Sequence, residues 1–486
     1  MSTVKRIAKN AGIVFIGENA LKILSIILVF LIARTLGDSE YGKFSFVLSF
    51  TGLFYILLDL GTSLLIVREI AQNKEKAPKI VSNILILKTI TSIVVYGLIA
   101  FFAYILKYDT TTFYGILIAG LGIVFDSLAI TISSVFQAYE RMEFPVAAKI
   151  ARILIRFAIT VPLLLMNVGF LPILGVYVFV QFLNFIVALV MCFKVLIRPI
   201  LDFDKDLIIS LLKRSFPFLL SGIFVTLYFR VDITLMSKIA PTILNGVYGE
   251  ASRDAIIGWY SAAYNILDGL ISIALAVSTA ILPVAIMYHK ESKEKLIKLY
   301  HLSIKYLTYI SIPIAVGITL LADKIIVLIY KYKYINSTLA LQILVWTLVP
   351  LFINYMLGVL VIATNKEKDS VYILIGNLLV NLGLNIVLIP KLSLYGAALA
   401  TVLTEIFYFS GYYFLVRKEL GGVNLLKIFI RPIIACIAMA IAINALITLN
   451  VFVLIAIGAA IYFTVMYVLR AFSKEDFEML TRTVRK

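Results

Sequence analysis

Ten ionisable residues of this 486-residue chain lie inside long apolar segments and away from the segment ends, where a charge needs a partner or a functional role. They are Glu18, Lys22, Asp59, Lys88, Asp126, Arg156, Arg230, Asp232, Asp268 and Glu405. A charged side chain that faces lipid costs several kcal/mol, so such residues normally face a water-filled cavity or pair with one another. We therefore expect the functional site among these ten residues.

The basic members favour an anionic ligand. A guanidinium such as that of Arg156 can hold a phosphate through two parallel hydrogen bonds. The alternative for Arg156 is an ion pair with Asp126 or an anchoring role, and the sequence leaves both open. We expect Lys88 to extend its ammonium toward the cytoplasmic surface instead.

Two close pairs of charges have different geometry. Glu18 and Lys22 are four residues apart and share one helix face, so they line a cavity together or neutralise each other. Arg230 and Asp232 are two apart and point to nearly opposite faces of a helix. We expect Lys22 and Arg230 to face the cavity.

The acidic members could carry an ion. Buried carboxylates can bind protons or sodium in coupled transport. They can equally pair with the basic residues, and for three of them near the middle of their segments, Asp126, Asp268 and Glu405, we expect pairing. Asp59 and Asp232 remain candidates for the same two roles.

Catalytic and metal-binding signatures do not occur in the sequence. It contains no HExxH, CxxC, P-loop or GxSxG motif. Cys192 and Cys436 lie in separate apolar stretches, and both histidines, His289 and His301, lie in or beside one polar segment. We therefore expect no enzyme, no metal site and no cofactor, with Na⁺ or H⁺ as the coupling ion if transport is coupled.

The composition requires a membrane. Hydrophobic residues make up 62% of the chain and charged residues 15%, against roughly 45–50% and 25% in soluble domains. The net charge of +17 would suggest nucleic acid in a soluble protein. In so apolar a chain, it is better explained by basic residues that remain in cytoplasmic loops.

The apolar segments predict an all-α integral membrane protein with about fourteen transmembrane helices. We place them at 11–33, 44–67, 80–106, 113–138, 147–168, 171–197, 215–239, 257–284, 301–322, 338–364, 370–390, 394–416, 428–449 and 451–470. With both termini in the cytoplasm, 31 of the 44 lysines and arginines fall on the cytoplasmic side, as the positive-inside rule requires. We expect a multi-pass protein of the cell membrane.

The loops are short, so the domains are sets of helices. We expect a six-helix lobe at 1–197, a cytoplasmic linker at 198–214, a second six-helix lobe at 215–416, and two additional helices with a tail at 417–486. Two similar lobes around a central cavity are a common plan of transporters. We expect a monomer.

Several short motifs resemble one family of transporters. They are Leu36-Gly37-Asp38-Ser39-Glu40-Tyr41-Gly42-Lys43-Phe44, Asp59-Leu60-Gly61, Arg68-Glu69-Ile70, Arg230-Val231-Asp232, NLGLNIVLIP at 381–390, and Tyr395 to Thr401 followed by Glu405. Together they resemble the polysaccharide-biosynthesis (Wzx-type) flippases of the multidrug/oligosaccharidyl-lipid/polysaccharide exporter superfamily. The similarity covers essentially the whole chain, although the motifs are loose.

The resemblance implies a function as well as a fold. It implies two six-helix lobes that alternate in access and move a polyprenyl-phosphate- or diphosphate-linked oligosaccharide from the cytoplasmic to the outer leaflet. It also implies that basic cavity residues engage the phosphates, with Lys22, Arg230, Arg156 and Arg34 as the candidates here. Its partners would be the lipid-linked glycan, membrane lipids and glycan-assembly proteins, and no nucleic acid.

Other classes of function remain as alternatives. The first is an ion-coupled small-molecule or multidrug antiporter of the same superfamily, for which the basic residues are unsuited because cationic drugs favour an acidic cavity. The others are a membrane enzyme, which the short outer loops disfavour, and a scaffold in an export complex.

Overall fold

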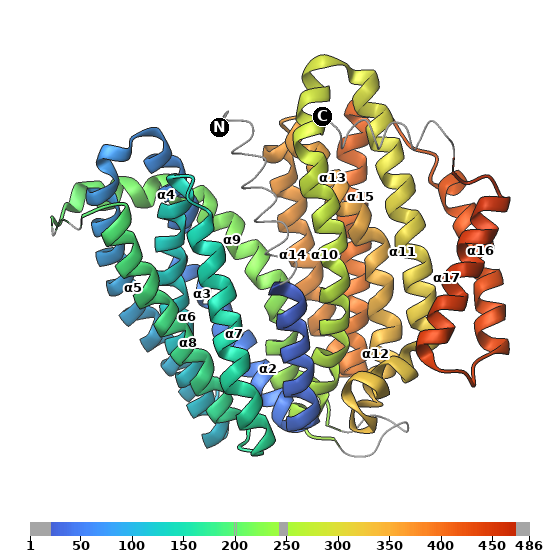
Figure 1. Cartoon of the computed structure of the whole chain (residues 1–486), viewed down its shortest axis with the longest axis horizontal. Coiled ribbons are helices and arrows are strands. Elements are labelled where there is room, and N and C mark those ends of the chain that lie inside the picture. The colour runs from blue at the N-terminus through green and yellow to red at the C-terminus, as the bar shows by residue number, and fades with distance from the viewer. Residues whose placement is uncertain (1–20, 199, 201, 243–250, 473–486) are drawn as a thin grey trace. The chain divides into compact units, whose positions relative to one another are not determined.

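The computed structural model describes residues 21–198, 200, 202–242 and 251–472. Within these residues every regular element is a helix, as Figure 1 shows. The prediction of an all-α protein is therefore confirmed for the described part of the chain.

The chain divides into two compact units. The first contains residues 1–242 and 250–258, and the second contains residues 243–249 and 259–486. The first unit holds a helix at 21–36, then α2 (Asp38–Leu53), α3 (Tyr55–Asp59), α4 (Thr62–Gln72), α5 (Ala77–Ile105), α6 (Thr110–Ala138), α7 (Glu143–Leu165), α8 (Phe170–Val195) and α9 (Lys205–Ile239). The predicted lobes, with a linker at 198–214 and a separate segment at 417–486, stay a prediction.

The main part of the second unit begins at Trp259, inside the long helix α10 (Arg253–Glu291), whose first turns belong to the first unit. The elements of the second unit are most of α10, α11 (Lys293–Tyr330), α12 (Ser337–Leu344), α13 (Leu348–Ala363), α14 (Glu367–Leu392), α15 (Leu394–Leu420), α16 (Leu425–Ala445) and α17 (Val451–Val468).

Eleven described segments are long and apolar enough to cross a bilayer, and α9 raises the number to twelve if its two bent parts form one span. At 1.5 Å per residue, the 26 residues of α8 reach about 39 Å, enough for a tilted crossing. The protein is thus a multi-pass membrane protein. The two remaining predicted spans are α7, whose hydropathy is lowered by four charged residues, and 11–33, which begins outside the described residues. The exact number of fourteen is not confirmed.

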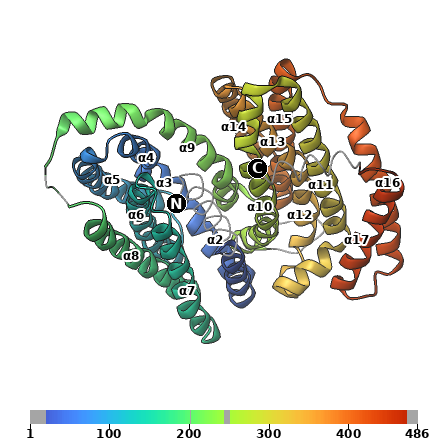
Figure 2. The ribbon, with the colours of Figure 1, turned by 45° about the horizontal axis from the view of Figure 1, so that its top comes forward.

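In the first unit, α6 is the central helix. It packs along α8 and also contacts α2, α4, α5 and α7 (Figure 2). Small residues allow this close packing, because Gly115, Gly120 and Gly122 each face a side chain of a neighbouring helix. The core near the α4–α5 turn includes Ile84, Phe136 and other buried residues of α4, α5, α6 and α8.

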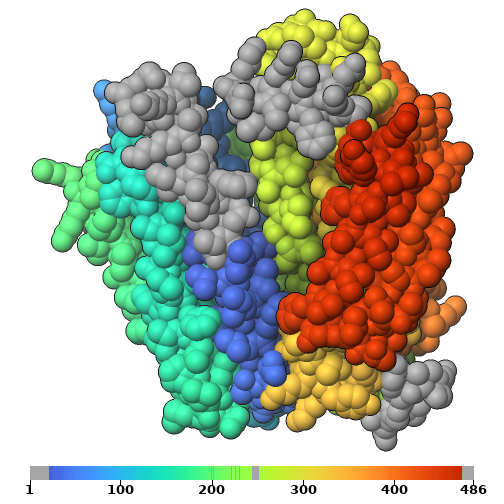
Figure 3. All heavy atoms as spheres, turned by 45° about the vertical axis from the view of Figure 1, so that its right-hand side comes forward, coloured from blue at the N-terminus to red at the C-terminus, as the bar shows by residue number. Residues whose placement is uncertain are grey.

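In the second unit, α15 packs on α12, α13 and α14, while α16 and α17 form a hairpin against α11. Figure 3 shows this hairpin, in red, forming a continuous surface at one side of the unit. A buried hydrogen bond joins it to α11, because the Tyr462 hydroxyl donates to the Tyr309 carbonyl oxygen over 2.8 Å. The two additional C-terminal helices predicted from the sequence therefore form a packed pair.

Side-chain caps determine where several helices begin. Asp109, Asp204, Ser292, Asn424 and Asn450 each accept a hydrogen bond from a backbone N–H in the first turn of the following helix. These N–H groups have no partner inside the helix, so each cap contributes about 1 kcal/mol.

Reciprocal glycine contacts join α2 to the first turns of α10. A Cβ on Gly42 would overlap the Asp254 carbonyl oxygen, and a Cβ on Gly258 would overlap that of Asp38. Lys43 lies beside this crossing, with its Nζ 2.9 Å from Asp109 Oδ2 and 3.8 Å from Asp254 Oδ2. Close approach of two backbones requires glycine, so the sequence specifies this contact.

Candidate functional site

The first unit holds a buried ion pair between α5 and α3. Lys88 is only 1% exposed, its Nζ lies 3.0 Å from Asp59 Oδ1, and it also lies 3.3 Å from Ser127 Oγ. The expectation that Lys88 reaches toward the surface is wrong, because its ammonium satisfies its hydrogen bonds inside the helix bundle. Asp59 takes the pairing role that the sequence left open.

The helix that carries Asp59 is interrupted directly after it. Leu60 and Gly61 have φ angles of 52° and 69°, in the left-handed region, and α4 starts anew at Thr62. The Asp59 carbonyl oxygen accepts a hydrogen bond from the Thr62 hydroxyl at 2.6 Å, and its carboxylate accepts one from Ser63. A broken helix beside buried charges is typical of transporter binding regions, where backbone groups freed by the break face polar neighbours.

A second ion pair in the same unit joins α7 to α6. Arg152 Nη1 lies 3.0 Å from Asp126 Oδ1 and 3.0 Å from Gln181 Oε1 on α8. Of the alternatives that the sequence leaves open for Arg156, pairing with Asp126 is not found, because Arg152 holds that carboxylate. Arg152 is a site residue that the sequence analysis missed, although its four-residue spacing from Arg156 was a usable signal.

Arg156 lies one turn beyond Arg152 on α7. Its guanidinium carbon lies 5.3 Å from the centre of the Tyr177 ring on α8, a distance typical of a cation–π contact. Figure 3 shows α7, in turquoise, at the surface of the first unit.

The other basic candidates lie on other helices. Lys22 is partly buried in the helix at 21–36, and Arg34 is exposed near the end of the same helix. Arg230 on α9 is exposed, and its guanidinium lies near Gly52 on α2. Asp232 is 5% exposed, in agreement with the expected opposite directions of Arg230 and Asp232. Glu18 lies outside the described residues.

The second unit buries the carboxylate of Glu405 among amide side chains. Glu405 on α15 is 4% exposed and accepts a hydrogen bond from Asn354 Nδ2 on α13 at 2.7 Å. Asp268 on α10 is exposed. The sequence analysis missed Asn354, an uncharged residue in an apolar run, for which no pattern gave a signal.

An asparagine row continues this interior along α14. Asn377, Asn381 and Asn385 recur every four residues, all are buried, and Asn381 Nδ2 lies 3.4 Å from Thr404 Oγ1 on α15. The amide oxygens of Asn354, Asn377 and Asn385 are buried and have no hydrogen-bond donor within the described residues. Such acceptors can hold water or a cation.

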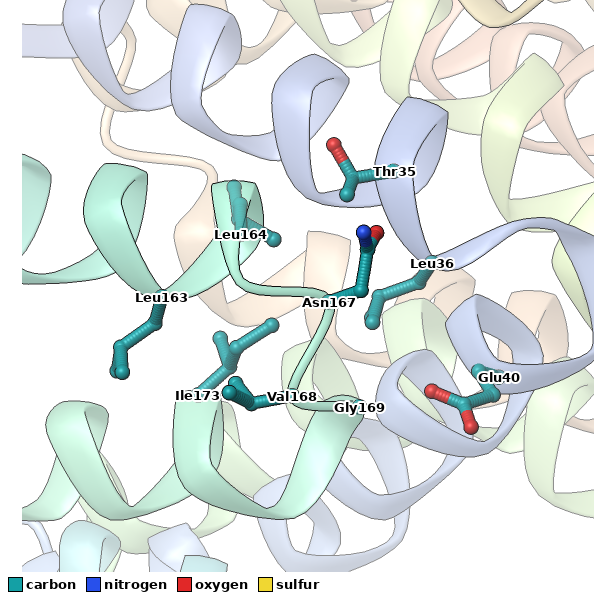
Figure 4. A pocket seen from close by; sticks show the side chains of 9 residues that line it. All are labelled: Thr35, Leu36, Glu40, Leu163, Leu164, Asn167, Val168, Gly169 and Ile173. Atoms are coloured by element: carbon teal, nitrogen blue, oxygen red, sulfur yellow. The ribbon is translucent and has the colours of Figure 1, made fainter.

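A cavity of about 420 Å³ lies in the first unit where α7 joins α8. Figure 4 shows its nine lining residues, with Asn167 in the α7–α8 turn, Thr35 and Leu36 on the neighbouring helix, and Glu40 on α2. None of the four basic candidates is among these nine residues. The polar residues Thr35, Glu40 and Asn167 line it together with aliphatic residues, and its one charge, that of Glu40, is negative, so it does not suit an anionic headgroup.

Within the described residues, no group of three or more histidine, cysteine, aspartate or glutamate side chains could hold a metal ion. The described residues offer ion pairs, amides and aromatic rings inside a helical membrane protein.

The chain matches a known protein family. Residues 7–289 match the family described as polysaccharide biosynthesis protein. A comparison with curated protein sequences found no match.

Solved structures with a similar fold are membrane transport proteins. The lipid II flippase MurJ, in an inward closed conformation, is 17% identical, has a TM-score of 0.77, and the match covers 94% of this chain and 98% of that chain. An inward-facing multidrug resistance MATE family transporter of the MOP superfamily is 16% identical, with a TM-score of 0.64 and coverage of 84% and 95%. A MOP superfamily transporter from Pyrococcus furiosus, whose binding pocket is described as having reverse polarity, is 16% identical, with a TM-score of 0.58 and coverage of 86% and 95%. At these identities the likeness establishes the fold.

Proposed function

The chain belongs to the polysaccharide biosynthesis protein family, and we propose that it flips a polyprenyl-phosphate- or diphosphate-linked oligosaccharide from the inner to the outer leaflet of the cell membrane. The observation that carries this proposal is the charge of the first unit's interior. Three basic side chains, Lys88, Arg152 and Arg156, lie there with two carboxylates, Asp59 and Asp126. An excess of positive charge inside a membrane protein suits an anionic ligand.

The physics of the substrate supports the same proposal. The sugar headgroup cannot cross hydrocarbon, because each polar group would lose its hydrogen bonds to water. A polar passage that opens to one side at a time removes this penalty, while the prenyl chain stays in lipid. Two compact units are the bodies that such a rocking mechanism needs.

We propose fourteen spans with both termini in the cytoplasm. The eleven apolar segments, α9, α7 and the helix that contains residues 21–36 together give this number. The basic candidates Lys22, Arg34, Arg156 and Arg230 then serve the headgroup, and the protein acts as a monomer without catalysis. Glycan-assembly proteins would supply and consume its substrate.

We also propose coupling to Na⁺ or H⁺ through the second unit. Glu405 is buried and accepts a hydrogen bond from Asn354, whose own amide oxygen is buried with no donor among the described residues, so a bound cation would neutralise Glu405 and satisfy that oxygen. Asp268 is the second acidic candidate of that unit. An imposed Na⁺ or pH gradient should change the translocation rate, and Glu405→Gln should remove this dependence.

The alternative is an ion-coupled antiporter for small cationic molecules. The buried carboxylate of Glu405 in the second unit favours it, whereas the basic interior of the first unit does not. Proteoliposomes separate the two functions: we expect translocation of a diphosphate-linked glycolipid and no uptake of a cationic dye such as ethidium. Dye uptake with no glycolipid movement would favour the antiporter.

A further inference from the structure

One face of α7 carries a row of polar residues along the first unit. Lys149, Arg152, Arg156 and Thr160 recur at intervals of three or four residues, so they lie one above another on the helix. Apolar residues occupy most of the remaining positions of α7. The row therefore extends polar chemistry over three turns of a helix that packs on α6 and α8.

The two carboxylates near this row already form ion pairs with basic side chains. Asp126 pairs with Arg152 at 3.0 Å, and Asp59 pairs with Lys88 at 3.0 Å. Lys88, Arg152 and Arg156 are thus three cations against the two carboxylates. Arg156 is the cation without a carboxylate partner among the described residues, and it contacts the neutral ring of Tyr177. A cation in this position lacks a matching negative charge among the described side chains.

Two hydrogen-bond donors of the row point to a missing acceptor. Arg156 Nε and Thr160 Oγ1 are both buried, and neither has a hydrogen-bond partner among the described residues. Thr160 is 0% exposed and does not bond to the backbone of its own helix, which a helical threonine ordinarily does. Buried donors are nearly always satisfied, so two such groups one turn apart call for a ligand that accepts from both.

Residues of α8 and α6 hold the guanidinium of Arg156 in place. Tyr177 lies against it, and Gly122 on α6 leaves the room that the ring occupies, because a Cβ on Gly122 would overlap Tyr177. An arginine held by an aromatic ring keeps its planar donors in a defined orientation for an oxyanion.

From these observations we propose that Arg156 and Thr160 form the binding site for one phosphate or diphosphate group, with Tyr177 as the residue that positions Arg156. This proposal rests on the proposed function and identifies which of its basic residues contacts the phosphate. The oxyanion would satisfy Arg156 Nε and the Thr160 hydroxyl together and would supply the negative charge that the layer lacks.

Binding of farnesyl diphosphate to the detergent-solubilised full chain tests this proposal. We expect Arg156→Gln to weaken binding by roughly tenfold or more, the loss expected for a hydrogen bond to a charged group. Thr160→Val should weaken it by a smaller factor, and Arg156→Lys should restore part of it. Farnesol, which lacks the phosphates, should bind equally to all variants. Arg68→Gln is the matched control, because Arg68 is an exposed arginine of the same unit.

Thermal unfolding without ligand separates a binding role from a structural one. Arg156→Gln removes a buried Nε donor that has no hydrogen-bond partner and also the contact with Tyr177, so the two effects oppose each other and we expect the unfolding midpoint to stay near that of the native chain. Equal affinity of the native chain and Arg156→Gln for farnesyl diphosphate would overturn the proposal, and so would a lower midpoint that accounts for the lost binding.

The source of the phosphate is tested by competition. Inorganic pyrophosphate should compete more weakly than farnesyl diphosphate, because it lacks the prenyl chain. Equal competition by phosphatidylglycerol would make the site a phospholipid site and overturn the assignment to prenyl phosphates. Arg156-dependent binding in a chain that flips no glycolipid would contradict the proposed function alone, whereas flipping with Arg156-independent binding would contradict this site alone.

Discussion

The ammonium of Lys88 lies 3.0 Å from the carboxylate of Asp59, directly before the point where the helix carrying Asp59 breaks. Removing one partner would leave the other charge buried and unpaired. We expect Lys88→Met to lower the free energy of unfolding by about 3–5 kcal/mol.

The double variant Lys88→Met with Asp59→Asn should be less destabilised than the sum of the two single variants. Denaturation in detergent measures the free energy of unfolding of the native chain, the two single variants and the double variant, which together form a double-mutant cycle. Exactly additive single effects would show that the two residues do not interact. Lys366→Ala, which breaks an exposed pair with Glu419, is the control, and we expect little change.

The glycine crossing of α2 and α10 gives a second prediction. Gly42→Ala places a Cβ against the Asp254 carbonyl oxygen, so the two backbones must separate. We expect a loss of about 1–3 kcal/mol, as for other overpacked contacts. Gly97→Ala is the control, since a Cβ at Gly97 meets nothing within 4 Å and alanine favours a helix. A thermal unfolding midpoint lowered equally in both variants would contradict the importance of the crossing.

Acid should weaken the contacts that Asp204 makes at the start of α9. Hydrogen bonds from Lys79 and from the Leu207 backbone N–H hold the pKa of Asp204 below its ordinary value. Since the folded-state pKa is lower than that of the unfolded chain, at about 3.9, this stabilisation is present above that pH. It is lost as the pH falls through the folded-state pKa.

Asp204→Asn keeps the cap but removes the charge. Its unfolding midpoint should lie below that of the native chain at pH 7, and the difference should disappear in acid. A difference that does not depend on pH would show that the charge contributes nothing.

Cysteine labelling tests the proposed orientation. The two native cysteines are buried, Cys192 at 0% and Cys436 at 3% exposed, so the native chain should react slowly with a membrane-impermeant maleimide. Lys293→Cys should react only from the cytoplasmic side and Tyr332→Cys only from outside, because these exposed residues lie at opposite ends of α11. Labelling of both from the same side would contradict the proposed topology.

Much of the fold follows from the sequence because apolar length and basic loops are properties of short segments. Eleven apolar spans, the C-terminal helix pair and the cluster of intramembrane charges were all predictable in this way. The break at Leu60–Gly61 was not, since a single glycine does not distinguish a tolerated helix residue from a left-handed turn.

The ion pairs depend on contacts between distant segments, which explains the errors. Lys88 was assigned to the surface because its distance from the end of its own helix permits it, whereas its partner lies 29 residues earlier. Arg152 and Arg156 lie one turn apart on α7, so from the sequence alone either could pair with Asp126. Only the rotation of α7 against α6 selects Arg152.

The most direct test of the central claim is translocation in proteoliposomes that contain a diphosphate-linked oligosaccharide in the inner leaflet. An added glycosidase reports the fraction that reaches the outer leaflet. We predict that the native chain raises this fraction above that of protein-free vesicles, and that Arg156→Gln reduces the initial rate while Arg68→Gln does not. A fraction equal to that of protein-free vesicles, with both diphosphate- and monophosphate-linked glycans, would contradict the account.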